Sequence, residues 1–334
     1  MGGQDLRLGP DCGNDTSTMK RFFGNRQTTL AGEIALTGTG VHTGAPVSIL
    51  LSPADPDTGI TFVIPDGSDG EIEIPATSEA ISNVTLCTVL SDGNGSNVAT
   101  VEHLLAAVRG LGVDNIRIEI DSGEVPIMDG SSEPFVDAID EAGLVTQDAP
   151  RRFIKVLKPV RVEDGDAWGE LTPHDGFLVD VGIQFDTPLI GKQRIRVEVT
   201  PDSFRGELAR ARTFGFMKDV ERLWAAGLAL GAALDNTVAI GDDRVINPEG
   251  LRFADEFVRH KALDAVGDLA LAGAPLLGAY RSHRGGHRLN SLMVKALLAD
   301  RTAWTIEEAP RRREVMHADA GFGAIAANYA ADHS

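Results

Sequence analysis

The chain has 334 residues, 43% of them hydrophobic and 24% charged, a composition typical of a globular protein long enough for two domains. Its formal net charge of −18 opposes nucleic-acid binding, because neutralising phosphates requires a basic face. The longest uncharged apolar stretch, residues 223–234, is too short to span a bilayer, which excludes a membrane-spanning protein and leaves transient association with a membrane surface open.

The ends of the chain and its cysteine content predict the compartment. Residues 1–27 are rich in Gly, Asp, Asn and Thr and are expected to form a flexible leader, while residues 311–334 are expected to form a peripheral tail. The sequence holds only Cys12 and Cys87, and no secretory hydrophobic segment is expected at its start. A disulfide framework is therefore not expected, and a cytoplasmic location is predicted.

The first half of the chain mixes strands and helices. Strands rich in β-branched residues are predicted at residues 47–51, 59–64 and 115–120. Apolar residues recur at helical spacing over residues 101–111, where Thr100 is predicted to be the N-cap, and a second helix is predicted around residues 135–139. The glycine-rich segment 38–44 lacks the spacing of a phosphate-binding loop, so it is predicted to be a turn between strands, with His42 facing a ligand.

The second half repeats this succession. Residues 146–152 carry breakers and charge and are predicted to be a domain boundary, which separates a first domain at 28–148 from a second at 149–310. Strands are then predicted at residues 153–162, 168–171, 178–185 and 194–199, and helices at residues 202–211, 218–226 and 254–271. Both halves end in a pair of helices, which indicates two similar α+β domains.

The helix predicted at residues 254–271 carries a candidate metal site. His260, Asp264 and Asp268 are each four residues apart, so they lie along one side of the helix. Histidine and aspartate one turn apart can bind one metal ion. The alternative interpretation is a solvated helix face, and for an isolated motif of this kind that alternative is favoured.

A second candidate is the pair Glu102 and His103 in the first turn of the helix at 101–111. Zinc hydrolases use three protein ligands, an open fourth position and a nearby base. His103 could supply the third ligand and Glu102 the base. The alternative is that Glu102 only stabilises the helix terminus and His103 is a hydrogen-bonded surface group.

Two further segments hold polar candidates. Glycines at residues 285–286 can bring His287 close to a substrate, and the ordinary pKa of histidine suits proton donation near neutrality; a mobile basic loop is an equally favoured alternative. Thr213 is either a hydrogen-bond donor or a helix terminator. The Ala- and Leu-rich stretch at 223–234 is more often plain core than a lipid-binding groove.

Taken together, these segments resemble one family, the UDP-3-O-acyl-N-acetylglucosamine deacetylases of lipid A biosynthesis. The resembling motifs occur in order over residues 29–304, at positions 39–44, 100–104, 126–131, 162–166, 209–217, 257–261 and 286–287. An ordered set of this kind is far more specific than any one of its members.

The resemblance implies a fold, a metal and a reaction. The fold would be two similar α+β domains, each with helices layered against β-sheets and with a small insert. The metal would be Zn²⁺, with Fe²⁺ as the alternative in cells because ligation by two histidines and an aspartate does not exclude it. The enzyme would be an amidohydrolase that removes the N-acetyl group of an acylated UDP-sugar and releases acetate. We expect a cytoplasmic monomer.

The resemblance also assigns roles to single residues. The matches to the metal ligands are His103, His260 and Asp264. Glu102 matches the general base, His287 the general acid, and Asp268 the carboxylate that orients this histidine. Thr213 matches the group that holds the oxyanion, and Lys261 a cationic substrate contact. Substrate contacts also fall on His42, Phe214, Phe216 and the passage at residues 216–239, whose small residues leave the preferred acyl-chain length open.

Two rival functions remain at this stage. The first is another zinc hydrolase that acts on a different acylated sugar or amide. The second is a non-catalytic protein that binds a glycolipid or a nucleotide sugar; the complete set of ligand, base and acid residues argues against it.

Overall fold

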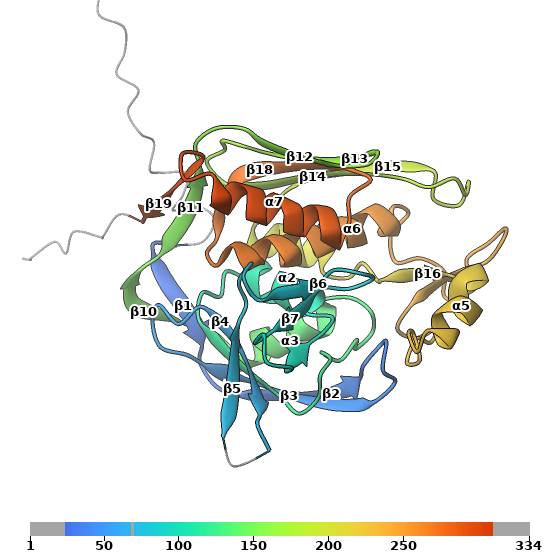
Figure 1. Ribbon diagram of the computed structural model, residues 1–334, viewed down its shortest axis with the longest axis horizontal. Coiled ribbons are helices and arrows are strands. Elements are labelled where there is room, and N and C mark those ends of the chain that lie inside the picture. The colour runs from blue at the N-terminus through green and yellow to red at the C-terminus, as the bar shows by residue number, and fades with distance from the viewer. Residues whose placement is uncertain (1–23, 68–69, 310–334) are drawn as a thin grey trace, which may run out of the picture.

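The computed structural model describes residues 24–67 and 70–309 (Figure 1). The predicted tail at 311–334 and residues 1–23 of the predicted leader lie outside this range. The end of the leader at residue 27 is wrong, because β1 (Arg26–Leu30) begins before it. The buried Gln27 side chain donates hydrogen bonds to Asp57 and to the Pro150 carbonyl, which fixes this part of the chain.

Five strands of the first half form one sheet, whose order is β2-β3-β9-β4-β5. Its members are β2 (Ile34–Thr39), β3 (Pro46–Pro53), β4 (Ile60–Pro65), β5 (Glu71–Pro75) and β9 (Ile116–Ile120). Helix α2 (Glu102–Gly110) precedes the central strand β9 and α3 (Glu133–Ala142) follows it. The strands and helices predicted for this half are therefore confirmed, as is the turn at 38–44 between β2 and β3.

The second half contains a seven-stranded sheet. Its members are β11 (Arg152–Val156), β12 (Val160–Asp164), β13 (Ala167–Thr172), β14 (Phe177–Gln184), β15 (Lys192–Glu198), β18 (Leu276–His283) and β19 (Trp304–Glu308). Helix α6 (Glu256–Leu269) continues into the 3₁₀ turn η3 (Ala270–Ala272) before β18, and α7 (His287–Ala299) follows β18.

The two sheets share one topology. The pairing β12-β13-β18-β14-β15 repeats β2-β3-β9-β4-β5 strand for strand: each has two antiparallel hairpins joined by a central strand that runs parallel to one neighbour and antiparallel to the other. In each half the central strand has one helix before it and one after it. The α+β fold class is confirmed, and the similarity of the halves is a repeat of topology.

A small insert precedes the first of these helices in each half. The first insert is the three-stranded sheet of β6 (Ile81–Asn83), β7 (Val89–Ser91) and β8 (Asn97–Val98). The second contains the parallel pair β16 (Phe214–Phe216) and β17 (Val238–Ile240), with the turn η2 (Met217–Asp219) and α5 (Val220–Ala225) between them. This agrees with the insert that the resemblance implies for each half.

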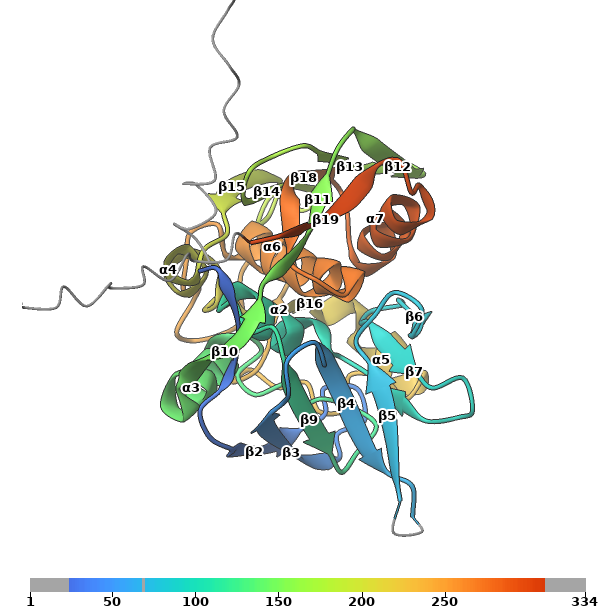
Figure 2. The same ribbon diagram turned by 90° about the vertical axis from the view of Figure 1, so that its left-hand side faces the viewer.

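Helices α2, α3, α6 and α7 lie between the two sheets, as Figures 1 and 2 show from two directions. Every residue of α2 is buried, and α6 is buried on nearly all sides. One connected hydrophobic core runs through both halves. The two halves therefore share their core, and the division into domains at residue 148 stays a prediction.

Several predicted boundaries are wrong for local reasons. The segment 146–152 has regular structure in place of the breakers read from its sequence, because β10 (Leu144–Pro150) pairs with β1 and Arg151 is fully buried; a domain boundary within it stays a prediction. The strand predicted at 153–162 is interrupted near Pro159, which has no N–H for a ladder.

The helix predicted at 202–211 consists only of α4 (Pro201–Ser203) and the π-helical turn η1 (Phe204–Leu208). The chain is no longer helical at Ala211, whose carbonyl oxygen lies 3.0 Å from Nδ1 of His260 on α6. Thr100 is not the N-cap of α2: its backbone is left-handed, with φ of 59°, and its hydroxyl donates to Glu124.

Gly267 lets α2 and α6 touch through their backbones. A Cβ atom at this position would lie 2.0 Å from the carbonyl oxygen of Glu102, a distance that no side chain tolerates. The contact places the first turn of α2 directly against the last turn of α6. Residues that are far apart in the sequence thereby share one buried space.

Gly267→Ala is predicted to force α2 and α6 apart and to lower the free energy of unfolding by about 1–3 kcal/mol. Gly206→Ala is the matched control, since Gly206 is also helical but has nothing within 4 Å of an added Cβ. Denaturant unfolding of both variants measures the effect, and an unchanged free energy for Gly267→Ala would contradict the tight contact.

Candidate active site

Three buried side chains from α2 and α6 form a group that could hold a metal ion. His103, His260 and Asp264 each offer a ligand atom, and these atoms lie within 4.8 Å of one another. The Nε2 atoms of His103 and His260 lie 3.5 and 3.3 Å from the same oxygen, Oδ1 of Asp264. The tertiary structure therefore brings the residue from the first helix to the pair on the second.

The hydrogen bonds around this group fit a cation. Oδ1 of Asp264 is buried and has no hydrogen-bond partner, whereas its Oδ2 accepts from Lys261 Nζ at 2.9 Å. Nδ1 of His260 lies 3.0 Å from the Ala211 carbonyl oxygen, so Nδ1 carries the proton and the lone pair of Nε2 stays free. A buried carboxylate oxygen without a donor is costly unless a cation meets it.

Burial and charge set the protonation states that a metal ligand needs. Burial lowers the pKa of His260 to about 3, so its imidazole is neutral. Burial alone would raise the pKa of Asp264, but His260 and Lys261 lower it well below its ordinary value. A neutral imidazole beside an ionised carboxylate is the state that binds a divalent cation. The alternative interpretation of His260 and Asp264 as a solvated helix face is wrong, since each is only 1% exposed.

Glu102 is the first residue of α2 and lies beside this group. Its Oε2 accepts a hydrogen bond of 3.0 Å from the Thr88 backbone N–H, and its Oε1 lies 3.7 Å from Nε2 of His287. Burial is the largest cause of a pKa raised above the ordinary value for glutamate. A carboxylate with a raised pKa is a better proton acceptor at neutral pH.

His287 begins α7 and is held from behind by Asp268. Nδ1 of His287 lies 2.9 Å from Oδ2 of Asp268. Burial alone would lower the pKa of His287, but Asp268 and then Glu102 raise it to about 9, so the ring is protonated at neutral pH. His287 is buried and fixed, which makes the alternative of a mobile basic loop wrong.

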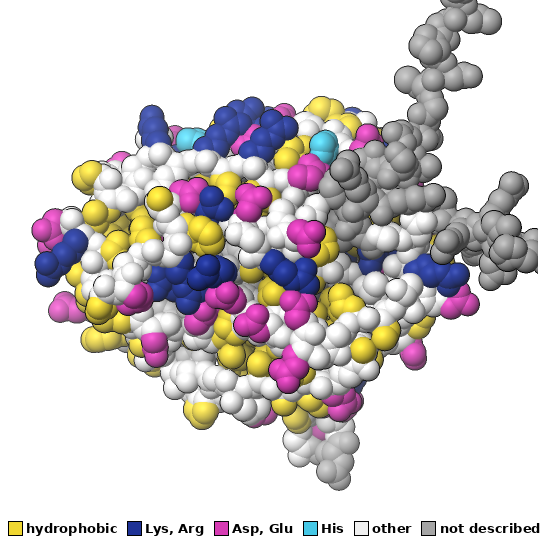
Figure 3. All heavy atoms as spheres, turned by 180° about the vertical axis from the view of Figure 1, so that it is seen from behind, with side chains coloured by type: hydrophobic (Ala, Val, Ile, Leu, Met, Phe, Trp, Pro, Cys, Tyr) yellow, Lys and Arg dark blue, Asp and Glu magenta, His cyan; other side chains and the backbone are white. Residues whose placement is uncertain are grey.

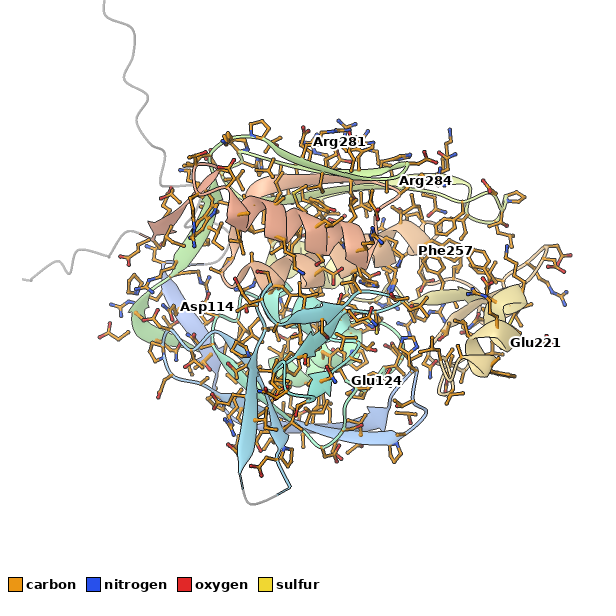
Figure 4. The ribbon with its side chains drawn as sticks, viewed as in Figure 1. Asp114, Glu124, Glu221, Phe257, Arg281 and Arg284 are labelled. Atoms are coloured by element: carbon orange, nitrogen blue, oxygen red, sulfur yellow. The ribbon has the colours of Figure 1, made fainter. Side chains whose placement is uncertain are left out.

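One cavity of about 470 Å³ collects the predicted site residues. All of them line it except Asp268, which lies behind His287. Thr213 and Phe214 come to it from the start of the second insert, and His42 from the turn between β2 and β3. The ring of Phe214 packs edge-on against Phe257 of α6 at 5.0 Å, and Figure 4 shows Phe257 between α6 and the second insert.

The second insert forms an apolar wall of this cavity. The wall is lined by Met217, Val220, Leu223, Trp224, Ala229, Ala232, Ala233 and Leu234. Trp224 is 56% exposed, and no residue of 220–235 is buried. The Ala- and Leu-rich stretch is therefore not plain core. Figure 4 shows Glu221 on the outer side of α5, which gives the helix a polar outer face.

Lys261 joins the main cavity to a second one of about 280 Å³. The second cavity is also lined by Phe185, Asp186, Arg284 and Gly285. Burial alone would lower the pKa of Lys261, but Asp264 raises it, so the ammonium group stays charged. Lys261 and Arg284 thus provide a local positive charge in an acidic protein.

More cations lie on the outer face of the adjacent sheet, where Figure 3 shows lysine and arginine side chains gathered at the top. Figure 4 places Arg281 there. Arg194 and Arg281 are more than half exposed but share the carboxylate of Asp180, at 2.5 and 4.0 Å. This pairing offsets part of the positive charge of the face.

The sequence did not single out the groups that support this site. Thr88 contacts both Glu102 and Asp268, and Asn290 also donates to Asp268. The buried Glu124 accepts from the backbone N–H of His42 and from the Thr100 hydroxyl, so it connects the turn beside the cavity to the segment just before α2. Nothing in their local spacing distinguishes these residues, because their partners are distant in sequence.

Comparison with known proteins gives consistent results. The family model described as UDP-3-O-acyl N-acetylglycosamine deacetylase (LpxC) matches residues 27–299. Curated proteins named UDP-3-O-acyl-N-acetylglucosamine deacetylase from Brucella ovis and Brucella suis are each 57% identical over 284 residues, which cover 85% of this chain and 99% of the relative. The protein of that name from Brucella melitensis biotype 2 is 56% identical over the same span.

His260→Ala is predicted to lose bound divalent metal, because it removes one of three ligand atoms. The wild type is expected to retain about one ion per chain after dialysis against metal-free buffer. Elemental analysis of the purified protein is the measurement, with His283→Ala on β18 as the matched control. Full occupancy in His260→Ala would rule out its role as a ligand.

Proposed function

The chain belongs to the family of UDP-3-O-acyl-N-acetylglucosamine deacetylases, and we propose that it hydrolyses the N-acetyl group of such an acylated UDP-sugar and releases acetate. In this proposal the reaction is a step of lipid A biosynthesis. The observation that carries it is the convergence of a metal-binding group, a raised-pKa carboxylate and a protonated histidine on one cavity with an apolar wall.

His103, His260 and Asp264 would hold the metal, and Zn²⁺ is the proposed ion with Fe²⁺ as its competitor in cells. When bound, Zn²⁺ supplies Lewis-acid chemistry that activates a water molecule and polarises the amide carbonyl. Two neutral imidazoles and one carboxylate leave the site with a net positive charge, which favours that chemistry. Lys261 Nζ donates to Oδ2 of Asp264, the oxygen opposite the one that faces the two imidazoles, and keeps the carboxylate in place.

Glu102 and His287 divide the proton transfers. Glu102 accepts the proton of the attacking water, since its carboxylate is buried and only partly compensated by the Thr88 N–H. His287, already protonated, donates from Nε2 to the leaving nitrogen while Asp268 holds Nδ1. Nε2 of His287 and Oε1 of Glu102 are 3.7 Å apart, so the two groups can serve the water and the nitrogen that bond to the same carbonyl carbon.

Thr213 and Lys261 face the substrate on the remaining sides of the cavity. The Thr213 hydroxyl donates to the oxyanion, and a well-placed donor of this kind contributes about 3–4 kcal/mol. Lys261 and Arg284, in the second cavity, attract the diphosphate of the nucleotide. His42 and the rings of Phe214 and Phe216 contact the sugar and nucleotide portions.

The apolar wall of the second insert binds the acyl chain. Its exposed side chains would otherwise present a large apolar patch to water, which proteins avoid unless it binds something. Small residues at 229–233 leave room along the wall. A transient contact of this wall with a membrane surface is part of the proposal, since the substrate carries a lipid chain.

Acetate release tests the proposed function directly. The metal-loaded protein is expected to deacetylate UDP-3-O-acyl-N-acetylglucosamine and to leave simple N-acetyl sugars without an acyl chain nearly untouched. Equal rates on both would favour a hydrolase of different specificity, and no turnover on either, with metal bound, would favour a non-catalytic binding protein.

Glu102→Gln is predicted to keep its metal and to lower kcat by about 10²–10⁴-fold, because it removes the proton acceptor. Glu133→Gln is the matched control, since Glu133 is likewise the first residue of a helix but lies outside the cavity. Near-normal turnover by Glu102→Gln would end its assignment as the base.

The pH profile of kcat/KM is predicted to be bell-shaped. Activity rises as Glu102 loses its proton, at a pH above the ordinary glutamate pKa of 4.5, and falls as His287 loses its proton near pH 9. His287→Gln should lower kcat and abolish the basic limb. A basic limb that persists in this variant would show that another group is the acid.

Ala233→Leu is predicted to narrow the apolar passage and to lower kcat/KM for a long-chain substrate about tenfold or more, with a smaller effect on a short-chain one. Ala226→Leu, also exposed but outside the cavity wall, is the control. Equal losses with both chain lengths would argue against acyl binding at this wall.

A further inference from the structure

Thr88 donates hydrogen bonds both to Glu102, the proposed base, and to Asp268, which holds the proposed acid His287. It lies in the first insert, immediately before β7, and is 1% exposed. Its backbone N–H donates to Oε2 of Glu102 at 3.0 Å, and its hydroxyl donates to Oδ1 of Asp268 at 2.6 Å. One residue of the first half thus joins a carboxylate on α2 to a carboxylate on α6.

These contacts complete a ring of four residues: Thr88, Glu102, His287 and Asp268. On the opposite side of the ring, His287 faces the same two carboxylates: Nδ1 lies 2.9 Å from Oδ2 of Asp268, and Nε2 lies 3.7 Å from Oε1 of Glu102. Each carboxylate therefore has one oxygen toward Thr88 and the other toward His287. Rotation of either carboxylate would break the contact with Thr88.

The Thr88 hydroxyl also determines which oxygen of Asp268 is left to accept hydrogen bonds from His287 and Asn290. Oδ2 of Asp268 accepts from His287 and, at 2.8 Å, from the side-chain amide of Asn290. Asn290 is itself fixed by the Tyr280 hydroxyl, which donates to its Oδ1 at 2.7 Å. With Oδ1 taken by Thr88, the carboxylate has a single orientation that directs Oδ2 at His287.

The backbone around Thr88 is held in an unusual conformation. Leu86, two residues earlier, has a left-handed φ of 70°, which a bulky side chain rarely adopts. The carbonyl of Thr88 accepts from the N–H of Val101, the residue that precedes α2. Leu86 and Cys87 line the cavity while Thr88 does not, so Thr88 faces the carboxylates rather than the substrate.

We propose that Thr88 is a positioning residue, which fixes Glu102 and His287 relative to each other for the two proton transfers. The inference rests on the proposed deacetylase function. Because Thr88 does not reach the cavity, its hydroxyl contributes to kcat and leaves substrate binding unchanged. Because its partner is Asp268 and not a metal-binding residue, metal content is also unchanged.

Three variants test this proposal on the full-length, metal-loaded protein. Thr88→Val keeps the shape and the backbone N–H but removes the hydroxyl donor, and it is expected to lower kcat by about 10- to 100-fold, the usual weight of a hydrogen bond to a charged group. KM and metal content should stay within about twofold of the wild type. Thr88→Ser retains the donor and should retain most of the activity. Thr61→Val, a buried threonine on β4 that does not line the cavity, is the matched control.

The outcomes separate this proposal from the proposed function. If the wild type does not deacetylate the acylated UDP-sugar, the proposed function fails. If it does and Thr88→Val turns over normally, or Thr88→Ser loses as much as Thr88→Val, the positioning role is overturned. A loss of metal or a rise in KM that accounts for the lost activity also overturns it. Thr88→Ala, without the added methyl group, decides the matter if Thr88→Val does not fold.

A double-mutant cycle identifies the partner. In the Asp268→Ala background the Thr88 hydroxyl has lost its acceptor, so Thr88→Val should change kcat by less than about twofold. An undiminished 10- to 100-fold effect in that background would show that Thr88 acts through another group, and would overturn the proposed route through Asp268.

Discussion

The backbone contact between α2 and α6 is the constraint on which the rest of the site depends. The glycine at 267 allows the Glu102 carbonyl to approach α6 more closely than any side chain would permit. These two helices occupy equivalent places in the repeated topology, one before each central strand. The metal-binding group straddles their contact, with His103 on one helix and His260 and Asp264 on the other. The site is thus built at the junction of two similar halves.

Burial gives this junction its chemical character. Ionisable groups that would titrate ordinarily in water are here removed from it, and each takes a state set by its neighbours. His260 is neutral because it is desolvated, whereas His287 is protonated because Asp268 and Glu102 outweigh its desolvation. Two histidines in one cavity therefore differ in protonation state at neutral pH: His260 is neutral and His287 carries a positive charge. This difference fits the proposed roles, in which His260 binds a cation and His287 donates a proton.

The supporting structure shows where stability is given up for this arrangement. Leu86 and Thr100 hold left-handed backbone conformations at the edge of the cavity, and Asp264 leaves one buried oxygen without a donor. Such features destabilise a fold and persist only where the surroundings determine them. Leu86, Thr100 and Asp264 all line the main cavity, and the sheets on either side of it share one continuous core. Among the helices of the described residues, none is both long and apolar enough to cross a bilayer.

Local sequence patterns were enough to identify the chemical groups available and most of the secondary structure. Helical spacing put His260, Asp264 and Asp268 on one side of α6, and the ordered motifs indicated the family. Tertiary structure decided what spacing cannot: that this side of α6 is buried, that α2 touches it, and that the polar residues 146–150 belong to a paired strand. It also decided the contacts of Thr88, whose partners are 14 and 180 residues away. Local sequence determines which side chains lie together on one side of a helix. Which other element packs against that side is determined only when the whole chain folds.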